Sequence, residues 1–516
     1  MSNTHISQSL PSWMDRRATG LLLHPSSLPG SQGIGSLGAE ARSFVDFLEM
    51  AGFSYWQTCP LGPTGFGDSP YQVFCSNAGN PYFIDWNPVQ EIGLLSETDL
   101  LPLQELRAES TDYGGLYEVF FPLARTAYSN FQRHRNALEL KYGSIEAFKK
   151  KKHLWLIPFA CFQALKSAHN NHPWWIWADE FRSPVDFLSI ESKYANDCNF
   201  HIFLQYLFFS QWTELKTYAN EKGISILGDL PIYAAPDSSD VWANQSLFQL
   251  NSENFPFQNV AGVPPDYFNQ DGQSWGNPLY RWEVHEEDDF SWWIQRLEAQ
   301  VEIFDIVRID HFRAFHDYWS IPSSSGAAKD GHWENGPGIK FWSRINEVFP
   351  QRPFLAEDLG LITDEVRCLR DQAGLPGMAV LQFAFDGDSK NLYLPHNLAK
   401  NLVLYLGTHD NDTTCGWYDK ADEEIRGNFR SYLNVSGDYP SWDLLRFAYR
   451  TVSPLVIVPV QDLLGLGSEA RLNSPGLASG NWQWRMSHTQ LNSLFESSSY
   501  LREQAKITGR LKVNDK

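Results

Sequence analysis

Eight short apolar runs, each ended by polar residues, constrain the fold of this 516-residue chain more than any other feature. Near-continuous Val, Ile and Leu runs are typical of strands buried on both faces, as in parallel sheets. Helical patterns separate several of the runs, and strand–helix alternation repeated eight times predicts an α/β fold, a (β/α)8 TIM barrel. The runs are Gly20–His24, Tyr55–Pro60, Ile224–Asp229, Ile306–Asp310, Phe354–Asp358, Ala379–Phe385, Leu402–Asp410 and Leu455–Asp462.

Two of the intervening helices carry clear boundary signals. Apolar residues recur at helical spacing from Phe200 to Asn220, and Gly223 follows as a stop. Thr363 stands before two acids, and that pattern ends at Gly374. Acids early and glycine late suit the helix dipole.

Two long segments exceed simple connections, and we expect both to be insertions into one catalytic barrel spanning residues 1–516. Residues 86–199, after the second strand, read mostly as helix, for example over Leu116–His134 and Ile145–Ala168. Residues 231–290, after the third strand, are rich in Pro, Gly, Asn and aromatics and are expected to form a lid.

The ends of the predicted strands carry polar side chains where barrel enzymes place their active sites. These residues are His24, Asp229, Asp310, Glu357, Asp358, His409, Asp410 and Asp462. A single such acid is as easily explained as a helix N-cap, but acids on five strand ends would meet at one mouth and raise one another's pKa. Carboxylates clustered without metal-ligand spacing indicate acid–base and nucleophilic chemistry, as in glycoside cleavage.

Individual roles follow from the neighbours of three of these acids. Arg308 precedes Asp310 by two residues, so both point the same way from a strand, and the guanidinium would keep Asp310 ionised and nucleophilic. A purely structural Arg308 is the alternative. Glu357 follows an apolar stretch that would raise its pKa, as a general acid requires. Asp410, beside His409, could grip sugar hydroxyls.

Charge and composition narrow the partners. The net charge of -20 repels phosphate backbones and anionic lipids, which leaves a neutral substrate and excludes nucleic acid and membrane. The six cysteines are scattered without a CxxC pair, so we expect reduced thiols. With no apolar h-region before residue 18 and no run of 18 apolar residues, the expected location is cytoplasmic. Most of the 20 Trp, 21 Tyr and 34 Phe belong to the core, and some are candidates to lie flat on sugar rings.

An ordered set of motifs identifies a family resemblance that runs nearly end to end. The central ones are GDLPIY (Gly228–Tyr233), RIDHF (Arg308–Phe312), AEDLG (Ala356–Gly360) and GTHDN (Gly407–Asn411), with LHPSSLPG, GDSPYQ, GNPYFID, GVPPDYF, GQSWGNPLYRW and GNWQWR around them. Together they resemble the 4-α-glucanotransferases of the amylomaltase or disproportionating type, glycoside hydrolase family 77 of the α-amylase clan. No C-terminal β-sandwich is expected.

The resemblance implies transfer of α-1,4-glucan segments from a glucan or maltooligosaccharide donor to the 4-hydroxyl of an acceptor sugar, glucose included. It implies a retaining double displacement with Asp310 as nucleophile, Glu357 as acid/base and Asp410 as transition-state stabiliser. No cofactor or metal is expected, and the oligomeric state stays open.

Substrate-binding positions are likewise implied by the matching motifs, and His311 is a further candidate to line the pocket. The residues that match the family's binding positions are Arg308 and His409 beside the reacting sugar, Asp229 after the third strand, Ser69 and Tyr71 on the donor side, Tyr267 and Phe268 in an aromatic loop, Gln273 and Trp275 just after it, and Asn481 near the end.

Three other interpretations remain to be tested against this one: an α-amylase-like hydrolase, a non-catalytic glucan-binding barrel and an NAD-linked oxidoreductase. The last rests on a GxGxxG match over Gly33–Gly38, but Pro25 and Pro29 separate it from the preceding strand. An acidic stretch, His285–Asp289, resembles a metal cluster only in composition, because it lacks ligand spacing.

Overall fold

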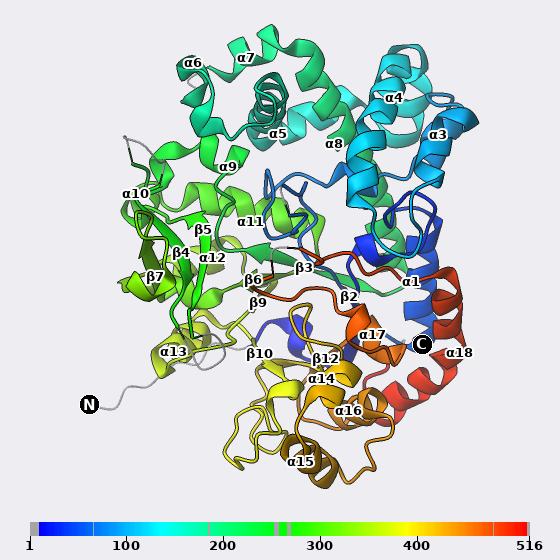
Figure 1. The fold of residues 1–516 in the computed structure, drawn as a ribbon, viewed down its shortest axis with the longest axis vertical. Helices are drawn as coiled ribbons and strands as arrows, with labels where there is room; N and C mark the ends of the chain where they lie inside the picture. Colours follow the sequence, from blue (N-terminus) through cyan, green and yellow to red (C-terminus); the bar gives the residue numbers. More distant parts are fainter. Residues whose placement is uncertain are drawn as a thin grey trace.

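Eight parallel strands form the central sheet in a computed structural model that describes residues 10–65, 67–183, 186–251, 257–265, 270–477 and 479–512 (Figure 1). The strand order is β10-β11-β12-β1-β2-β3-β6-β9. The strands are β1 (Ala18–Leu22), β2 (Tyr55–Gln57), β3 (Ser225–Pro231), β6 (Ile306–Asp310), β9 (Phe354–Ala356), β10 (Gly377–Val380), β11 (Leu402–Tyr405) and β12 (Leu455–Pro459).

The sheet closes into a barrel between its two outer strands. Ala356 at the end of β9 donates its N–H to the carbonyl of Pro376, just before β10, at 2.9 Å. Inside, one apolar cluster takes a side chain from every strand, for example Leu22, Tyr55, Leu227, Ile306, Leu355, Met378, Val403 and Leu455. Each of the eight apolar runs supplies one strand in the expected order, so the predicted barrel is confirmed.

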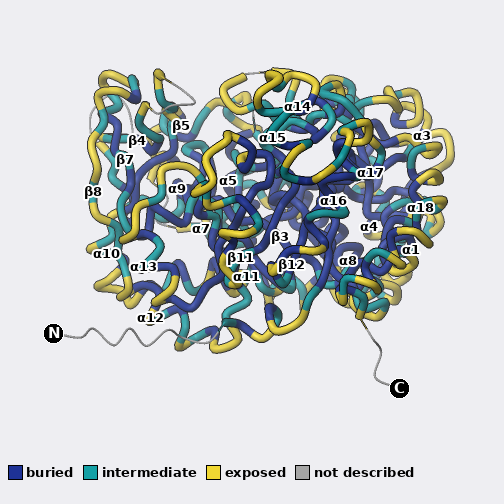
Figure 2. The backbone as a smooth tube through the Cα atoms, turned by 90° about the horizontal axis from the view of Figure 1, so that it is seen from below, coloured by how far each residue is buried: buried dark blue, intermediate teal, exposed yellow. Residues whose placement is uncertain are grey.

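Helices surround the barrel, and Figure 2 shows the buried strands at its centre with exposed residues concentrated on the periphery. The helices outside the two long insertions are α1 (Ala39–Ala51), α11 (Ser291–Ile303), α12 (Gly338–Val348), α13 (Asp364–Ala373), α14 (Thr414–Lys420), α15 (Glu423–Leu433), α16 (Pro440–Tyr449), α17 (Val460–Leu463) and α18 (His488–Ile507). Helix α13 begins after Thr363, whose backbone is extended, and ends at Gly374 with φ 69°, as its sequence signals predict.

The chain between β2 and β3 is mostly helical and lies over one side of the barrel in Figure 1. It contains α2 (Asn87–Glu91), α3 (Glu97–Gln104), α4 (Tyr113–Tyr142), α5 (Ile145–Ala168), α6 (Asp179–Arg182), α7 (Phe187–Lys193) and α8 (Ala195–Glu221). Aromatic contacts join these helices, such as Phe131 of α4 on Phe203 of α8, with ring centroids 5.1 Å apart. Helix α8 includes the predicted stretch from Phe200, and Gly223 follows it with φ 75°.

A four-stranded antiparallel sheet with the order β5-β4-β7-β8 stands beside the barrel. The chain after β3 supplies α9 (Ser239–Trp242), β4 (Asn259–Val263), β5 (Gln273–Pro278) and α10 (Trp282–Glu287), and the chain after β6 supplies β7 (Asp317–Pro322) and β8 (His332–Asn335). The segment 231–290 therefore pairs with residues that follow Asp310. No strand is predicted over 317–335, because polar and aromatic residues mix there without an apolar run.

After β12 the described chain contains α17, a loop over residues 471–477 and 479–487 and α18, and it forms no further strand. Within the described ranges, every helix is too short or too polar to cross a membrane.

Candidate active site

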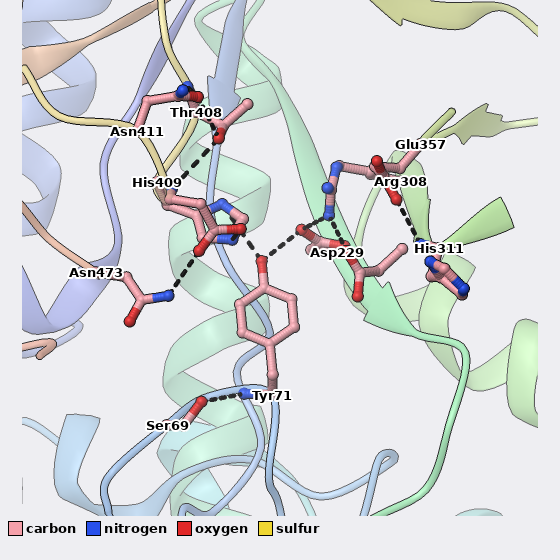
Figure 3. A network of polar contacts seen from close by, with 12 residues as sticks. Ser69, Tyr71, Asp229, Arg308, His311, Glu357, Thr408, His409, Asn411 and Asn473 are labelled. Atoms are coloured by element: carbon pink, nitrogen blue, oxygen red, sulfur yellow. Dashed lines mark hydrogen bonds and ion pairs between the residues drawn. The ribbon is translucent and has the colours of Figure 1, made fainter. Parts of the chain in front are cut away.

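The carboxyl ends of four barrel strands carry the acids expected to do the chemistry. Asp229 lies on β3, Asp310 ends β6, Glu357 follows β9 and Asp410 stands five residues after β11. In a parallel barrel these ends open on the same face, and Figure 3 shows the polar contacts that join the side chains gathered there.

Arg308 is the cation at the centre of this cluster. Its Nη1 lies 2.6 Å from Asp229 Oδ2 and 2.9 Å from Asp310 Oδ1, and its side chain is only 4% exposed. Burial alone would lower the pKa of Arg308, but the two carboxylates outweigh burial and raise it. The guanidinium therefore stays charged beside Asp310, as the two-residue spacing predicts.

Asp229 is the most buried acid of the group, with a side chain 1% exposed. Tyr71 donates its hydroxyl to Asp229 Oδ2 at 2.8 Å, while Oδ1 has no hydrogen-bond partner among the described residues. Burial raises the pKa of Asp229 to about 6 even though Arg308 opposes that change. Asp229 thus depends on its two partners to remain ionised near neutral pH.

Glu357 is held by two main-chain donors. The N–H of His311 reaches Oε2 at 2.7 Å and the N–H of Leu359 reaches Oε1 at 2.9 Å. His311 has a left-handed backbone with φ 54°, and this turn directly after Asp310 aims its N–H at Glu357. Burial raises the pKa of Glu357 to about 7, with Arg308 lowering it and Asp310 adding to the rise. A carboxyl group that holds its proton near neutrality can act as a general acid.

Asp410 has the opposite electrostatic environment. His409 Nε2 lies 3.2 Å from Oδ2, and Asn473 donates its side-chain amide to Oδ1 at 2.6 Å. Burial alone would raise the pKa of Asp410, but His409 and Asn473 lower it to about 2. Burial would also lower the pKa of His409, which Asp410 raises instead. Asp410 is therefore ionised at neutral pH, whereas Glu357 can hold a proton there.

Tyr71 connects the two halves of the site. Its ring stacks on His409 with centroids 5.0 Å apart and planes inclined by 19°, and its hydroxyl lies 3.4 Å from His409 Nδ1. Ser69 accepts the N–H of Tyr71 at 3.2 Å and so fixes the local turn. Trp482 packs against both rings at 5.9 and 5.8 Å. The stack of Tyr71, His409 and Trp482 thereby links Asp229 on β3 to Asp410 after β11.

The remaining predicted binding residues differ in position. Trp275 donates its indole N–H to Gln273 at 3.1 Å, and its ring meets the ring of His311 edge-on with centroids 4.9 Å apart. Because His311 binds Glu357, Trp275 lies on the Glu357 side of the site. Asn481 accepts the N–H of Ser474 and donates to Leu477, each at 2.9 Å, so in this structure it braces its own loop. Tyr267 and Phe268 lie outside the described residues.

Two of the strand-end acids do not join the cluster. Asp358 pairs with Arg370 of α13 at 2.5 Å and accepts the N–H of Met378 at 2.7 Å. Asp462 accepts both the N–H and the hydroxyl of Thr414 at 2.7 Å and so supports the start of α14. The expectation that all these acids converge was wrong for this pair, because other elements satisfy their oxygens.

His24 is the third strand-end residue with a local partner. Its Nδ1 lies 3.1 Å from the hydroxyl of Thr58, and burial lowers the pKa of His24 to about 3. It is therefore a neutral group that is bound to Thr58 rather than to any of the four acids.

Neither a metal nor a dinucleotide finds a built site in the described parts of the chain. No group of three or more His, Cys, Asp or Glu residues there could hold a metal ion. The glycines from Gly33 to Gly38 form a loop that enters α1, and a Cβ at Gly38 would come within 2.4 Å of Asp85. The close approach of Asp85 explains why position 38 is glycine, so a bound phosphate is not needed to explain it.

Three contact residues were missed by the reasoning from sequence: Arg471, Asn473 and Trp482. Arg471 and Asn473 lie in a segment without helical or strand periodicity, whereas Trp482 belongs to the GNWQWR motif that also contains Asn481. Asn473 donates a hydrogen bond to Asp410, and Trp482 packs against the rings of Tyr71 and His409.

Comparison with known proteins gives a consistent result. A family described as 4-alpha-glucanotransferase matches residues 23–491. The chain is 48% identical over 505 residues to a 4-alpha-glucanotransferase of Thermus thermophilus, covering 96% of this chain and 99% of that one. It is 40% identical over 508 residues to the chloroplastic/amyloplastic 4-alpha-glucanotransferase of Solanum tuberosum, covering 96% and 87%. The amylomaltase from Streptococcus agalactiae, solved in complex with acarbose, superimposes with a TM-score of 0.91 at 38% identity, covering 96% and 100%.

Proposed function

Because this chain belongs to the 4-alpha-glucanotransferase family, we propose that it transfers α-1,4-glucan segments through a covalent glycosyl-aspartate with retention at the anomeric carbon. The transferase activity is the family's own. The proposal concerns how the residues of this chain carry it out. One observation supports it most: the residue after Asp310 donates its N–H to Glu357 at 2.7 Å, which ties the two carboxyl groups to one turn.

In the first step, Asp310 attacks the anomeric carbon and a carbon–oxygen bond forms to its carboxylate. Arg308 Nη1 lies 2.9 Å from Asp310 Oδ1 and holds that oxygen in place for the attack. The glycosidic bond breaks at the same time, and Glu357 gives its proton to the leaving oxygen, which departs as the 4-hydroxyl of the shortened glucan. The pKa of Glu357, raised to about 7, keeps that proton available.

Asp410 and His409 act on the sugar ring in this scheme. The ring gains positive charge in an oxocarbenium-like transition state, and a fixed anion with a pKa of about 2 stabilises that charge. Both residues also present hydrogen-bonding groups to sugar hydroxyls. Tyr71, stacked on His409, is the candidate surface for the apolar face of the same ring.

In the second step, an acceptor hydroxyl attacks the anomeric carbon, the bond to Asp310 breaks and restores its carboxylate, and Glu357, now ionised, takes the hydroxyl proton. The acceptors we propose are the 4-hydroxyls of glucose, maltooligosaccharides and longer α-1,4-glucans. The Streptococcus agalactiae amylomaltase was solved with acarbose, which supports an α-glucan-shaped substrate here. Water competes with the acceptor, so transfer requires a site that holds the sugar hydroxyl in line. We assign that role to the segment between β4 and β5, which contains Tyr267 and Phe268.

The proposed intermediate can be captured with the Glu357→Gln variant and α-maltosyl fluoride. Fluoride leaves without a proton, so Asp310 is still glycosylated, but the glutamine cannot activate an acceptor and the glycosyl-enzyme accumulates. Intact-protein mass spectrometry should show one added maltosyl group, located on the peptide that contains Asp310. Asp310→Asn is the matched control and should gain no mass. A maltosyl group on another residue, or none while fluoride is released, would refute the assignment.

A further inference from the structure

The segment from Arg471 to Asn473 makes three hydrogen bonds to His409 and Asp410 and one within itself. Arg471 Nη2 donates to the carbonyl of Asp410 at 2.6 Å, and its Nε donates to the carbonyl of Asn473 at 2.7 Å. Asn473 donates its main-chain N–H to the carbonyl of His409 at 3.2 Å and its side-chain amide to Asp410 Oδ1 at 2.6 Å. Main chain and side chain of the segment after β11 are thus held from one neighbouring loop (Figure 3).

Asp410 needs such a support. Its side chain is 44% exposed, so packing alone does not fix its rotamer. His409 contacts Oδ2 at 3.2 Å, and because the two residues are adjacent in sequence that contact leaves the carboxylate free to swing with the turn. The charge-assisted bond from Asn473 to the other oxygen is the shorter of the two and comes from a separate element.

We propose that Asn473 is a positioning residue for the transferase reaction, fixing the orientation of Asp410, and that Arg471 in turn fixes Asn473 by binding the carbonyls of both residues. This inference rests on the role of Asp410 in the proposed function. Asn473 acts through Asp410 and is not itself required to touch the substrate. We call residues 471–473 the clamp. Arg471 holds it together because its guanidinium binds the main-chain carbonyls of both Asp410 and Asn473.

The clamp also connects Asp410 to the aromatic stack. Trp482 donates its main-chain N–H to the carbonyl of Leu472, inside the same segment, at 2.7 Å. Its ring packs against Tyr71 and His409. Residues 471–473 therefore orient Asp410 directly and also hold Trp482, which supports the ring of Tyr71. A displacement of residues 471–473 would disturb both at once.

The Asn473→Asp variant gives a readout that a merely structural role would not produce. Two carboxyl groups at this separation raise each other's pKa, so the pair holds one shared proton at low pH and repels once that proton is lost. His409 on its own segment and Arg308 on β6 favour the ionised form of Asp410, and Arg471 binds its carbonyl. The proton therefore resides on the introduced carboxyl, which then donates as the amide did.

We expect the ratio of kcat for Asn473→Asp to kcat for the wild type to fall about tenfold or more from pH 5 to pH 8, as that proton is lost and repulsion displaces Asp410. Asn473→Ala should lower kcat roughly 10- to 100-fold at every pH, because one charge-assisted hydrogen bond is removed. KM for maltotriose should change by no more than about twofold, since the effect lies in the transition state.

The matched control is Asn401→Asp, which sets a new carboxyl against Asp371, the present acceptor of the Asn401 amide at 3.0 Å. Asn401 stands just before β11, at the opposite end of that strand from the site. Its kcat ratio should stay close to one and constant with pH. If Asn473→Ala does not fold, the pH dependence of Asn473→Asp decides the question alone.

Asp410→Asn, measured in parallel, separates the two levels of the inference. If Asp410→Asn keeps wild-type kcat, the role of Asp410 in the proposed function fails. If Asp410→Asn collapses while the Asn473→Asp ratio is flat with pH, the positioning role alone is overturned, whatever the loss in Asn473→Ala. A pH-dependent ratio together with a collapsed Asp410→Asn supports both.

Discussion

Asp229 and Asp310 bind the same atom, Nη1 of Arg308, at 2.6 and 2.9 Å. The two acids differ sharply in exposure, because the side chain of Asp229 is 1% exposed and that of Asp310 is 29% exposed. The guanidinium therefore stands between a carboxylate sealed in the barrel and one that can meet a substrate. Asp229 needs the cation to be tolerated, and Asp310 needs it to stay reactive.

Replacing Arg308 with Met should damage both stability and catalysis. Two carboxylates would lose their shared cation, and removing one partner of a buried pair costs about 3–5 kcal/mol of unfolding free energy. The loss should be smaller at pH 5 than at pH 8, because Asp229 can then take a proton. Urea unfolding at both pH values measures it. Arg367→Met is the control, since the pair with Asp364 is exposed and contributes about 0–1 kcal/mol. Equal losses in the two variants would contradict the shared-cation role.

Much of this site follows from sequence because a parallel barrel brings all its strand ends together. Asp229, Asp310 and Glu357 could be placed at one mouth once their strands were recognised, and the spacing of Arg308 and Asp310 put both on one face of β6. The burial of Glu357 was likewise foreseeable from the apolar residues before it. These inferences use only strand order and the alternation of side chains.

The parts that sequence could not supply depend on the path of loops and the partner of each side chain. Asp358 directly follows Glu357, yet it pairs with Arg370 of α13. Asn473 reaches Asp410 from 63 residues away through a segment without periodicity. The β7–β8 hairpin also lacks an apolar run, because its short strands pair at the side of the barrel. Only the three-dimensional contacts distinguish a catalytic acid from a structural one here.

The pH dependence of transfer should reflect Glu357. Its pKa, raised to about 7, means that the proton for the leaving oxygen is lost as pH rises through that value. With maltotriose as donor, the rate constant of the first step should therefore fall about tenfold per pH unit above neutrality. With α-maltosyl fluoride the same limb should be absent, because fluoride needs no general acid. Rapid-mixing measurements with both donors test this, and identical profiles would mean that another group controls the limb.

The unfolding free energy should also depend on pH because the pKa of Glu357 is raised in the folded protein. The folded-state pKa of Glu357 lies above its ordinary value of 4.5, so the stability it contributes is fully present below about 4.5 and is lost as pH rises through about 7. Glu357→Gln cannot ionise and escapes that loss. The unfolding free energy of the variant relative to the wild type should therefore increase between pH 4.5 and pH 7. A difference that is constant with pH would show that Glu357 titrates normally in the folded protein.

Asp358 should prove structural although it is adjacent to the proposed acid. Its partner Arg370 is buried, with side chains 5% and 7% exposed, so Asp358→Asn should lower the unfolding free energy by about 3 kcal/mol. The kcat of the folded enzyme should stay within about twofold, because the two oxygens of Asp358 bind Arg370 and the N–H of Met378 and not the acid cluster. Asp371→Asn removes the other, half-exposed partner of Arg370 and should cost no more than about 1 kcal/mol. A collapse of kcat in Asp358→Asn would move Asp358 into the catalytic group.

The balance between transfer and hydrolysis should depend on Tyr267. Water is abundant around a glycosyl-aspartate, so transfer prevails only if an aromatic acceptor site holds the attacking sugar and excludes water. Tyr267→Ala should therefore raise the ratio of hydrolysis to transfer by roughly threefold or more. With maltotriose, transfer gives glucose and a ladder of longer chains at a constant number of reducing ends, whereas hydrolysis raises that number. Tyr439→Ala, which truncates a surface tyrosine that is 71% exposed, is the control and should leave the ratio unchanged. An unchanged ratio in Tyr267→Ala would remove the aromatic segment from the explanation, and the preference for sugar acceptors would then have to come from other residues, such as Trp275 beside His311.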